Sequence, residues 1–440
     1  MAITHVVTHV KFWESPGGVL LQFFLAGATV GTALLALPFS RTTPIELIDL
    51  LFTAMSAITV TGLVTMDTGS DYTAFGQAVI AMLIQVGGLG YMLIGTLLLL
   101  GYKQGISLRA QSTLGVTAQM SEHVSLFALI RFVVVFSLGS VAVMSVILSA
   151  VWWSDKGWGA VGYGLFHAIS AFNNAGFSLY SDSLMTVAGG QPIIWLHAMA
   201  FIFGGLGFVV VFECVMPKTP LSIHTRIMVY GTVGMLLLGT FALLVFERHN
   251  PALGEGSWRL THAFFQAATT RTAGFNSVDI AELSHASHVF MMINMVIGAG
   301  PGSTAGGIRL TTFVLLLTGL VAAVQGRHST RLLGRTLQVE QLLRASGILV
   351  LTLALLTLMC LLLLALEPEL NPMAVIFEVV SALGTVGLSL GITGSLGEHG
   401  KLLIIAIMLV GKVSPVMLFA ALAGRPECPL RYAGGNLNLG

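Results

Sequence analysis

Long apolar stretches alternate with shorter ones along the whole chain. About 20 apolar residues are needed for a helix to cross the hydrocarbon layer of a bilayer. The stretches that we expect to span are 17–38, 76–101, 127–152, 192–216, 226–246, 288–325, 345–366 and 400–424. Between the members of each successive pair lies a shorter stretch, namely 46–58, 159–172, 259–270 and 371–383. Segments this short cannot span as helices, but they suit half-helices that enter the membrane and turn back.

A repeated set of residues aligns the four short stretches. The alignment takes as position zero the glycines Gly62, Gly176, Gly274 and Gly387. A phenylalanine stands ten residues before each glycine, and a large apolar residue stands one residue after it. Six residues before the glycines stand Ser56, Ser170, Ala268 and Ser381. Small residues also recur within the second long stretch of each pair, at 87–90, 204–207, 298–301 and 411–414, where they allow close helix packing.

The composition agrees with a membrane protein. The chain of 440 residues is 55% hydrophobic and only 9% charged, whereas a soluble domain carries about 25% charged residues. A water-soluble globule and a disordered chain are therefore excluded. The net charge of +1 leaves no bulk basic surface for nucleic acid.

The distribution of basic residues predicts the orientation. If the N-terminus is cytoplasmic, the cytoplasmic side holds 13 of the 20 Lys and Arg residues against five acids, and the outer side holds 6 against 14. This follows the positive-inside rule, and the reverse orientation would break it. The half-helices would then all enter from outside, and the outer acids would concentrate cations at the mouth. Simple solvated loop charges are the alternative reading of those acids.

Half-helices that end at mid-membrane favour a cation there. The C-terminal end of a helix carries about half a negative charge on unpaired carbonyls, and glycine permits the positive φ that an outward turn needs. Rings of backbone carbonyls can replace the hydration shell of K⁺. The predicted filter residues are Thr59, Val60, Thr61, Gly62, Asn173, Asn174, Ala175, Gly176, Arg271, Thr272, Ala273, Gly274, Gly384, Thr385, Val386 and Gly387.

These filter segments contain no carboxylate, which favours a monovalent ion over calcium. We therefore expect an all-α polytopic membrane protein with four pseudo-repeats of helix, pore loop and helix around one central ion pore. The expected repeats are 17–101, 124–216, 225–325 and 341–424. Ordinary helix C-caps would explain each glycine alone, but not the shared phenylalanine and serine columns.

The sixth long stretch is too long for one straight helix. Residues 288–325 would extend about 57 Å at ~1.5 Å per residue, against a hydrocarbon core of about 30 Å. Its middle is rich in glycine and contains a proline, so we expect a break there that faces the ion path. The residues of this break are Gly298, Ala299, Gly300, Pro301, Gly302, Ser303, Thr304, Ala305, Gly306 and Gly307, and Lys412 in the last span lies at the same depth. A kinked packing helix is the alternative.

Lys412 lies about 12 residues into the last span, at the repeat depth of this break. A charge at that depth is costly unless it is paired or hydrated. We expect its ammonium to contact loop carbonyls and to repel cations when the gate is closed. A snorkelling lysine is the alternative reading, although position 412 is deep for it.

Other polar residues lie at membrane depth. Arg271 and Glu378 could form a supporting ion pair behind the filter. We expect Asn173 and Asn174 to hold the loop shape through their amides, with direct contact to the ion as the alternative, and His167 to be a packed or hydrogen-bonded residue.

The segments SAITVTGL, NNAGFS, TTRTAGFN and GTVGLS, together with GAGPGSTAGGIR, resemble the Trk/Ktr/HKT superfamily of potassium transporters, and most of all its KtrB-type membrane subunits. The resemblance implies a homodimer with one pore per protomer in the lipid bilayer of a bacterial plasma membrane. It also implies a cytosolic KtrA-like nucleotide-binding ring and activation by Na⁺. It makes 298–307 an intramembrane gating loop. Relatives usually carry arginine at the position of Lys412.

Glycine at all four filter positions favours K⁺ uptake within this family, since plant members that prefer sodium carry serine in the first loop. A sodium-selective or weakly selective path of the same build is the closest alternative. An intramembrane enzyme is a distant one, because the chain has no GxSxG, HExxH or paired intramembrane aspartates. A receptor or scaffold would leave the four re-entrant loops without a purpose. No Walker or Rossmann motif occurs, so the chain should hold no organic cofactor and a nucleotide must come with a partner.

Overall fold

A computed structural model describes residues 15–101, 126–186, 189–215, 221–327 and 330–414. Residues 124–125, 187–188 and 216 of the second expected repeat, and 415–424 of the fourth, lie outside the described residues. So do several of the basic residues used for the orientation, namely Lys11, Lys103, Arg109, Lys218, Arg425 and Arg431.

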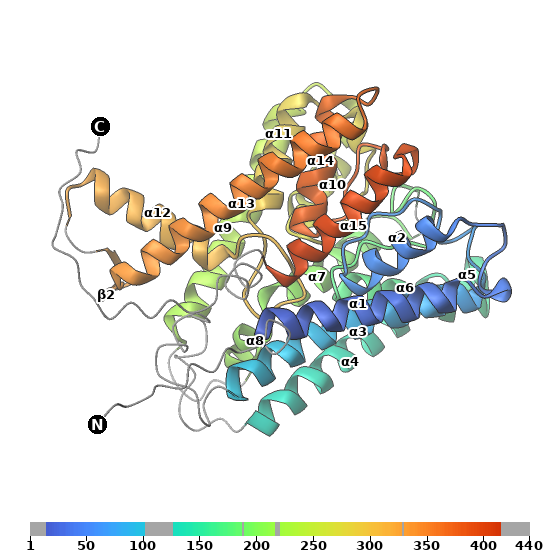
Figure 1. Cartoon of the computed structure of the whole chain (residues 1–440), viewed down its shortest axis with the longest axis horizontal. Helices are drawn as coiled ribbons and strands as arrows, with labels where there is room; N and C mark the ends of the chain where they lie inside the picture. Colours follow the sequence, from blue (N-terminus) through green and yellow to red (C-terminus); the bar gives the residue numbers. More distant parts are fainter. Residues whose placement is uncertain (1–14, 102–125, 187–188, 216–220, 328–329, 415–440) are drawn as a thin grey trace, which may run out of the picture.

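The described chain is mostly helical (Figure 1). The first half contains α1 (Pro16–Leu35), α2 (Leu47–Ile58), α3 (Ala74–Gly101), α4 (Leu126–Val151), α5 (Trp153–Lys156), α6 (Gly159–Phe172), α7 (Gln191–Leu206) and α8 (Phe208–Val215). The second half contains α9 (Ile223–Phe246), α10 (Ser257–Thr269), α11 (His285–Val296), α12 (Leu310–Val324), β1 (Arg331–Leu332), β2 (Arg335–Thr336), α13 (Val339–Leu366), α14 (Pro372–Gly384) and α15 (Glu398–Val413). Single 3₁₀ turns are η2 (Pro38–Ser40), η4 (Pro251–Leu253), η5 (Ile280–Glu282) and η6 (Thr393–Ser395).

The short helices form where the sequence predicts them. α2, α6, α10 and α14 begin and end within two residues of the expected half-helices. Local sequence explains the start of α14, because Pro372 occupies its first turn and the Asn371 side chain accepts a hydrogen bond from the Met373 N–H at 2.9 Å. Within the described residues, the C-terminal halves of these helices are largely buried.

The long stretches depart from the expected eight spans at the α7–α8 junction. Within the described residues, five helices are long and apolar enough to cross a membrane, or six if one bent pair counts as a single span. That pair is α7 and α8, which meet at 99°, so the prediction of one continuous span over 192–216 is wrong. The break over 288–325 is present, since α11 ends at Val296 and α12 begins at Leu310. The last span is described only as far as Val413, the end of α15.

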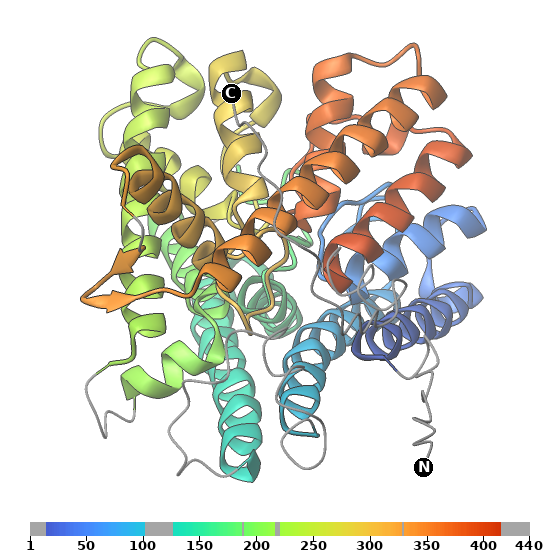
Figure 2. The ribbon, with the colours of Figure 1, turned by 60° about the vertical axis from the view of Figure 1, so that its left-hand side comes forward.

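The short helices are arranged around one centre and are linked through the helices between them. α6 packs against α3, α10 against α7, α14 against α11, and α2 against α15. Thus α6, α10 and α14 each contact the first helix after the preceding short helix. The contact between α15 and α2 closes the circle. At one end of the bundle, α12, the β1–β2 hairpin and the beginning of α13 project outward (Figures 1 and 2).

Glycines in the helices after the short helices allow this close packing. A Cβ built on Gly87 would lie 1.9 Å from the carbonyl oxygen of Ile58, at the end of α2. A Cβ on Gly204 would lie 2.0 Å from the Phe172 oxygen, and one on Gly411 would lie 2.2 Å from the Leu383 oxygen. Each of these carbonyls belongs to the residue four before a position-zero glycine. The small-residue segments therefore let three helices touch the C-terminal turns of α2, α6 and α14.

A substitution at Gly87 tests this packing. Gly87→Ala should destabilise the protein by about 1–3 kcal/mol, because a methyl group would be forced against a backbone carbonyl that cannot move away. Gly139→Ala in α4 is the matched control, since a Cβ there meets nothing within 4 Å. The melting temperature of the purified protein should fall for Gly87→Ala and stay the same or rise for Gly139→Ala. Equal melting temperatures would contradict this account of the packing.

Candidate ion pathway

The loops after the short helices share one backbone pattern. The position-zero glycines have φ between +71° and +99°. Two residues before them, Val60, Asn174, Thr272 and Thr385 also have positive φ, between +50° and +74°. Positive φ is costly for residues other than glycine and persists only where the surroundings enforce it. The sequence predicted the glycine conformation but gave no sign of the second left-handed residue.

The position-zero glycines form a closed ring of contacts between loops. A Cβ built on Gly62 would lie 2.4 Å from the carbonyl oxygen of Ala175, and one on Gly274 would lie 2.4 Å from the oxygen of Val386. A Cβ on Gly387 would lie 2.2 Å from the Thr61 oxygen. A Cβ on Gly176 would lie 2.8 Å from the Cα of Gly274.

The order of contacts is therefore loop one to two, two to three, three to four, and four back to one. Each glycine is needed because the next loop occupies the space of its side chain. The carbonyls of Thr61, Ala175, Ala273 and Val386 stand beside this ring.

Hydroxyl groups tie each loop back to its helix. The N–H groups of Gly62 and Gly387 each donate to the serine six residues earlier, Ser56 and Ser381, at 3.1 Å. In the second loop Ser170 instead donates to the carbonyl of Phe177 at 2.7 Å. The third loop has alanine at this column, and the neighbouring Thr269 donates to the carbonyl of Phe275 at 2.7 Å. The serine column thus fixes the loop backbone, and Thr269 takes its place where serine is missing.

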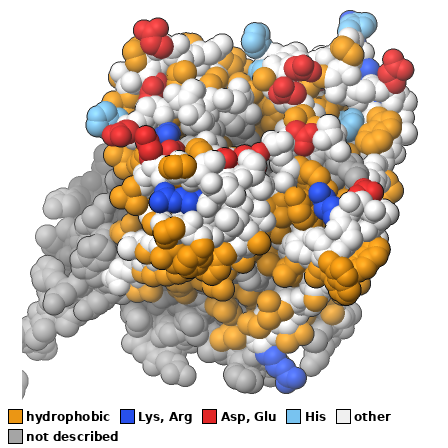
Figure 3. All heavy atoms as spheres, turned by 90° about the vertical axis from the view of Figure 1, so that its right-hand side faces the viewer, with side chains coloured by type: hydrophobic (Ala, Val, Ile, Leu, Met, Phe, Trp, Pro, Cys, Tyr) orange, Lys and Arg blue, Asp and Glu red, His pale blue; other side chains and the backbone are white. Residues whose placement is uncertain are grey.

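A cavity of ≈290 Å³ opens above the ring, and all four position-zero glycines line it. Asp67 and Asp182 line the same cavity. Tyr180 also lines the cavity. The ammonium of Lys156 in α5 lies 4.9 Å from the centre of the Tyr180 aromatic ring. Figure 3 views the molecule from the side on which α5 lies in Figure 1, and Asp and Glu side chains gather over its upper part. Carboxylates near a mouth raise the local concentration of cations.

The break between α11 and α12 forms an ordered loop. The N–H of Gly298 donates to the carbonyl of Ile308 at 2.8 Å, so the two ends of the loop are joined. The N–H of Gly300 donates to the Gly205 carbonyl at 2.9 Å, and the Phe208 N–H donates to the Gly302 carbonyl at 3.4 Å. The loop therefore inserts where α7 gives way to α8. This insertion explains the 99° bend between them, because backbone groups freed at membrane depth need new partners.

The same loop contacts two of the predicted filter segments. Thr304 Oγ1 donates to the Asn174 side-chain oxygen at 3.3 Å. A Cβ built on Gly306 would lie 2.3 Å from Thr385 Oγ1. The loop thus contacts the second and fourth predicted filter segments at their left-handed residues, Asn174 and Thr385.

Lys412 contacts the loop as the sequence predicted. Its ammonium donates to the carbonyl of Thr304, and the residue is only 1% exposed. Arg309, which sequence reasoning did not select, also binds the loop. Its guanidinium donates to the Gly300 carbonyl at 3.3 Å and to the hydroxyl of Tyr91 at 2.6 Å. Its position as the only charged residue of the segment GSTAGGIR could have identified Arg309 from the sequence. Two positively charged side chains, those of Lys412 and Arg309, therefore hold the loop.

The predicted ion pair between Arg271 and Glu378 is wrong. Glu378 accepts hydrogen bonds from Ser389 at 2.7 Å and from Thr393 at 2.5 Å, both in the segment that follows α14. Arg271 points elsewhere, into a small cavity lined by α7 and α9. Both residues lie at membrane depth, but Arg271 stands three residues before Gly274 and Glu378 nine before Gly387, and their side chains have different neighbours.

An ion pair that sequence reasoning missed joins α2, the first short helix, to α15, the last described helix. Lys401 Nζ in α15 lies 2.6 Å from Asp49 Oδ1 in the first turn of α2. Both side chains are largely buried, at 12% and 8% exposed. The pair reinforces the contact between α2 and α15 that closes the circle of helices.

The other polar residues behave as expected. Asn173 donates through its amide to the Gln85 side chain and to the Ile169 carbonyl, both at 2.9 Å. Asn174 accepts from Thr304. His167 is fully buried, and its Nε2 accepts from the Leu179 N–H at 3.3 Å. The asparagine amides thus support the loop shape.

Comparisons with known proteins agree with this architecture. The TrkH family model, described as "Cation transport protein", matches residues 22–425. The "Ktr system potassium uptake protein B" of Bacillus subtilis is 36% identical over 441 residues, covering 99% of this chain and 98% of that protein. Its namesake from Vibrio alginolyticus is 38% identical over 419 residues, covering 93% and 91%. The "Potassium/sodium uptake protein NtpJ" of Enterococcus hirae is 34% identical and covers 97% of both chains.

A solved structure has the same fold. The crystal structure of the potassium transporter TrkH from Vibrio parahaemolyticus superposes with a TM-score of 0.70 at 18% identity, covering 96% of this chain and 86% of that one. The matched family and these relatives are transporters, so the enzyme alternative is excluded. The chain is a multi-pass membrane protein that belongs to the TrkH/Ktr family of cation transport proteins, as its sequence motifs predicted.

Proposed function

We propose that this chain is the pore-forming subunit of a Ktr-like potassium uptake system in a bacterial plasma membrane. The observation that carries the proposal is the closed ring in which each position-zero glycine abuts the next loop, below a cavity with carboxylates at its wall. Relatives with 36% and 38% identity carry the name of potassium uptake proteins, and this supports K⁺ as the cargo.

The proposed filter uses backbone carbonyls rather than side-chain charges. It consists of 59–62, 173–176, 271–274 and 384–387, and the four expected pseudo-repeats each contribute one segment. Neutral carbonyls can replace the hydration shell of a weakly hydrated monovalent cation. Arg271 contributes its carbonyl only, because its guanidinium lies in a separate cavity.

The proposed gate is the loop 298–307 with Lys412. The loop blocks the path below the ring when it is held by the hydrogen bond between the Lys412 ammonium and the Thr304 carbonyl. A fixed ammonium in a water-poor site also repels a cation that enters from the filter. Opening then requires the loop to leave Lys412.

Partners and orientation complete the proposal. The N-terminus is cytoplasmic, the protein is a homodimer, and a cytosolic KtrA-like ring that binds nucleotide controls the gate. The projecting end of the protein supports such docking, because Arg327 just after α12 and Arg335 in the β1–β2 hairpin are exposed. Na⁺ acts as an activator. A sodium-selective path is the second candidate, and one relative is named a potassium/sodium uptake protein.

A pair of glycine substitutions in one segment tests the filter. Gly387 and Gly391 have nearly the same φ, +93° and +91°, but only Gly387 lies against another loop. Gly387→Ser should therefore lower the preference for K⁺ over Na⁺ at least ten-fold, whereas Gly391→Ser should leave it unchanged. Growth rescue of a K⁺-uptake-deficient bacterium at limiting K⁺, compared with ²²Na⁺ uptake, measures this preference. Wild-type uptake that favours Na⁺ would support the second candidate. An unchanged preference for K⁺ over Na⁺ in Gly387→Ser would contradict the filter proposal.

Substitution of Lys412 tests the gate. Loss of a hydrogen bond from a charged group, about 1.5–3 kcal/mol, corresponds to a shift of roughly ten-fold or more towards the open state. Lys412→Ala should raise K⁺ flux into proteoliposomes that lack a partner subunit. Lys412→Arg keeps the charge and the donor, so its flux should stay near that of wild type. Flux that is the same for Lys412→Ala and wild type would exclude this role.

Charge reversal tests the docking surface. The double variant Arg327→Glu and Arg335→Glu should lose co-purification with a cytosolic nucleotide-binding subunit, because it reverses the charge of the projecting end. Arg248→Glu is the control, since Arg248 is exposed just after α9, at the other end of the protein. The docking proposal fails if the double variant retains as much partner as wild type does.

A further inference from the structure

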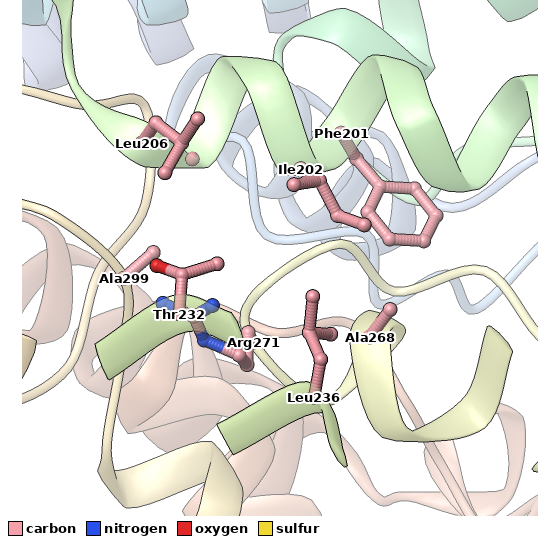
Figure 4. A pocket seen from close by; sticks show the side chains of 9 residues that line it. Phe201, Ile202, Leu206, Thr232, Leu236, Ala268, Arg271 and Ala299 are labelled. Carbon is pink, nitrogen blue, oxygen red and sulfur yellow. The ribbon is translucent and has the colours of Figure 1, made fainter. Parts of the chain in front are cut away.

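Arg271 occupies a small cavity that the proposed transport function does not use. The residue follows α10 and stands three residues before Gly274, and only 7% of it is exposed. Its side chain enters a cavity whose walls come from α7, α9, α10 and the break between α11 and α12. Figure 4 shows Arg271 and Thr232 approaching this space from the loop after α10 and from α9. Leu206, Leu236 and Ala299 provide apolar wall.

The guanidinium has no counter-charge in the part of the chain that the structure describes. The ion pairs found there are those of Arg344 with Glu340 and of Lys401 with Asp49. Arg271 Nε lacks a hydrogen-bond partner as well. Arginine cannot shed its proton inside a protein, so burial does not remove the charge. The C-terminal end of α10 offsets only part of it, because a helix end carries about half a charge.

A second buried donor faces the same cavity. The Thr232 hydroxyl has no hydrogen-bond partner among the described residues, and Thr232 is 4% exposed. A hydroxyl and a guanidinium in one apolar pocket form a donor set without a matching acceptor. Buried polar groups are almost always satisfied, and a buried charge requires a partner of opposite sign. The missing partner is therefore an acceptor that carries negative charge.

The size of the cavity limits what this acceptor can be. It offers ≈10 Å³ to the centre of a water-sized molecule, which is about the room of one such molecule. A chloride ion is only slightly larger than water and carries no polar substituents that the apolar wall would have to accept. Sulfate, phosphate and carboxylic acids exceed this space. A water molecule fits, but it supplies no charge to balance the guanidinium.

We propose that Arg271 and Thr232 form a binding site for a single halide ion, which is chloride under physiological conditions. The guanidinium N–H groups and the Thr232 O–H donate to the ion, and the leucine walls exclude larger anions. The proposal follows from the cavity alone and stands whichever cation the filter selects. If the filter proposal also holds, the halide screens the Arg271 charge from a cation at Gly274, three residues further along the chain.

Bromide replacement tests the site directly. Crystals of the wild-type chain grown in bromide should show an anomalous peak between the Arg271 guanidinium and Thr232, and the peak should be absent in Arg271→Gln. Thr232→Val removes one donor and leaves the charge, so its peak should be weaker. Absence of anomalous density in the wild type, with a water molecule or nothing in the cavity, would overturn the proposal.

Thermal stability gives a second readout that needs no crystal and no transport. At constant K⁺, exchange of gluconate for chloride should raise the melting temperature of the purified wild-type protein with saturating dependence on chloride. Arg271→Gln should lose this dependence, and Thr232→Val should need a several-fold higher chloride concentration for half the effect. If Arg271→Gln fails to fold, Thr232→Val alone decides. A wild-type melting temperature that does not respond to chloride would contradict a halide site.

Discussion

Backbone carbonyls at membrane depth are the constraint on which the rest of this structure depends. α2, α6 and α14 end inside the protein, where their last carbonyls cannot be satisfied by bulk water. The fold brings the glycines Gly87, Gly204 and Gly411 against those ends and uses hydroxyl groups to fix the loops that follow. The remaining carbonyls then stand beside the ring of position-zero glycines. Close packing and cation affinity thus have the same cause. Because glycine has no side chain, neighbouring segments can touch its backbone, and backbone carbonyls can face the ion.

The segment after α11 departs from this pattern and forms the loop that we propose as the gate. Gly298 contacts the Gly306 carbonyl of its own loop instead of a short helix. The loop that results pushes into the junction of α7 and α8 and reaches Asn174, Thr385 and Lys412. A gate at this place would therefore sense both the filter and the neighbouring helices.

Much of the fold could be predicted from the sequence, because hydropathy and spacing report depth in the membrane. The ends of the short helices, the break after Val296 and the contact of Lys412 with the loop all follow from depth. The direction in which a side chain points around the central axis leaves no such signal in the sequence. For this reason the pair of Arg271 with Glu378 was wrong, and the pair of Asp49 with Lys401 was missed. The bend at Gly207 was missed because a glycine that packs and a glycine that breaks a helix look alike in sequence.

The central claim is that the four loops coordinate one monovalent cation through backbone oxygen. Anomalous diffraction from crystals grown in rubidium, which replaces K⁺ with little change in size, tests it most directly. The account predicts density on the shared axis, surrounded by the carbonyls of Thr61, Ala175, Ala273 and Val386. Rubidium bound only at side-chain carboxylates of the mouth, with no density inside the ring, would contradict it.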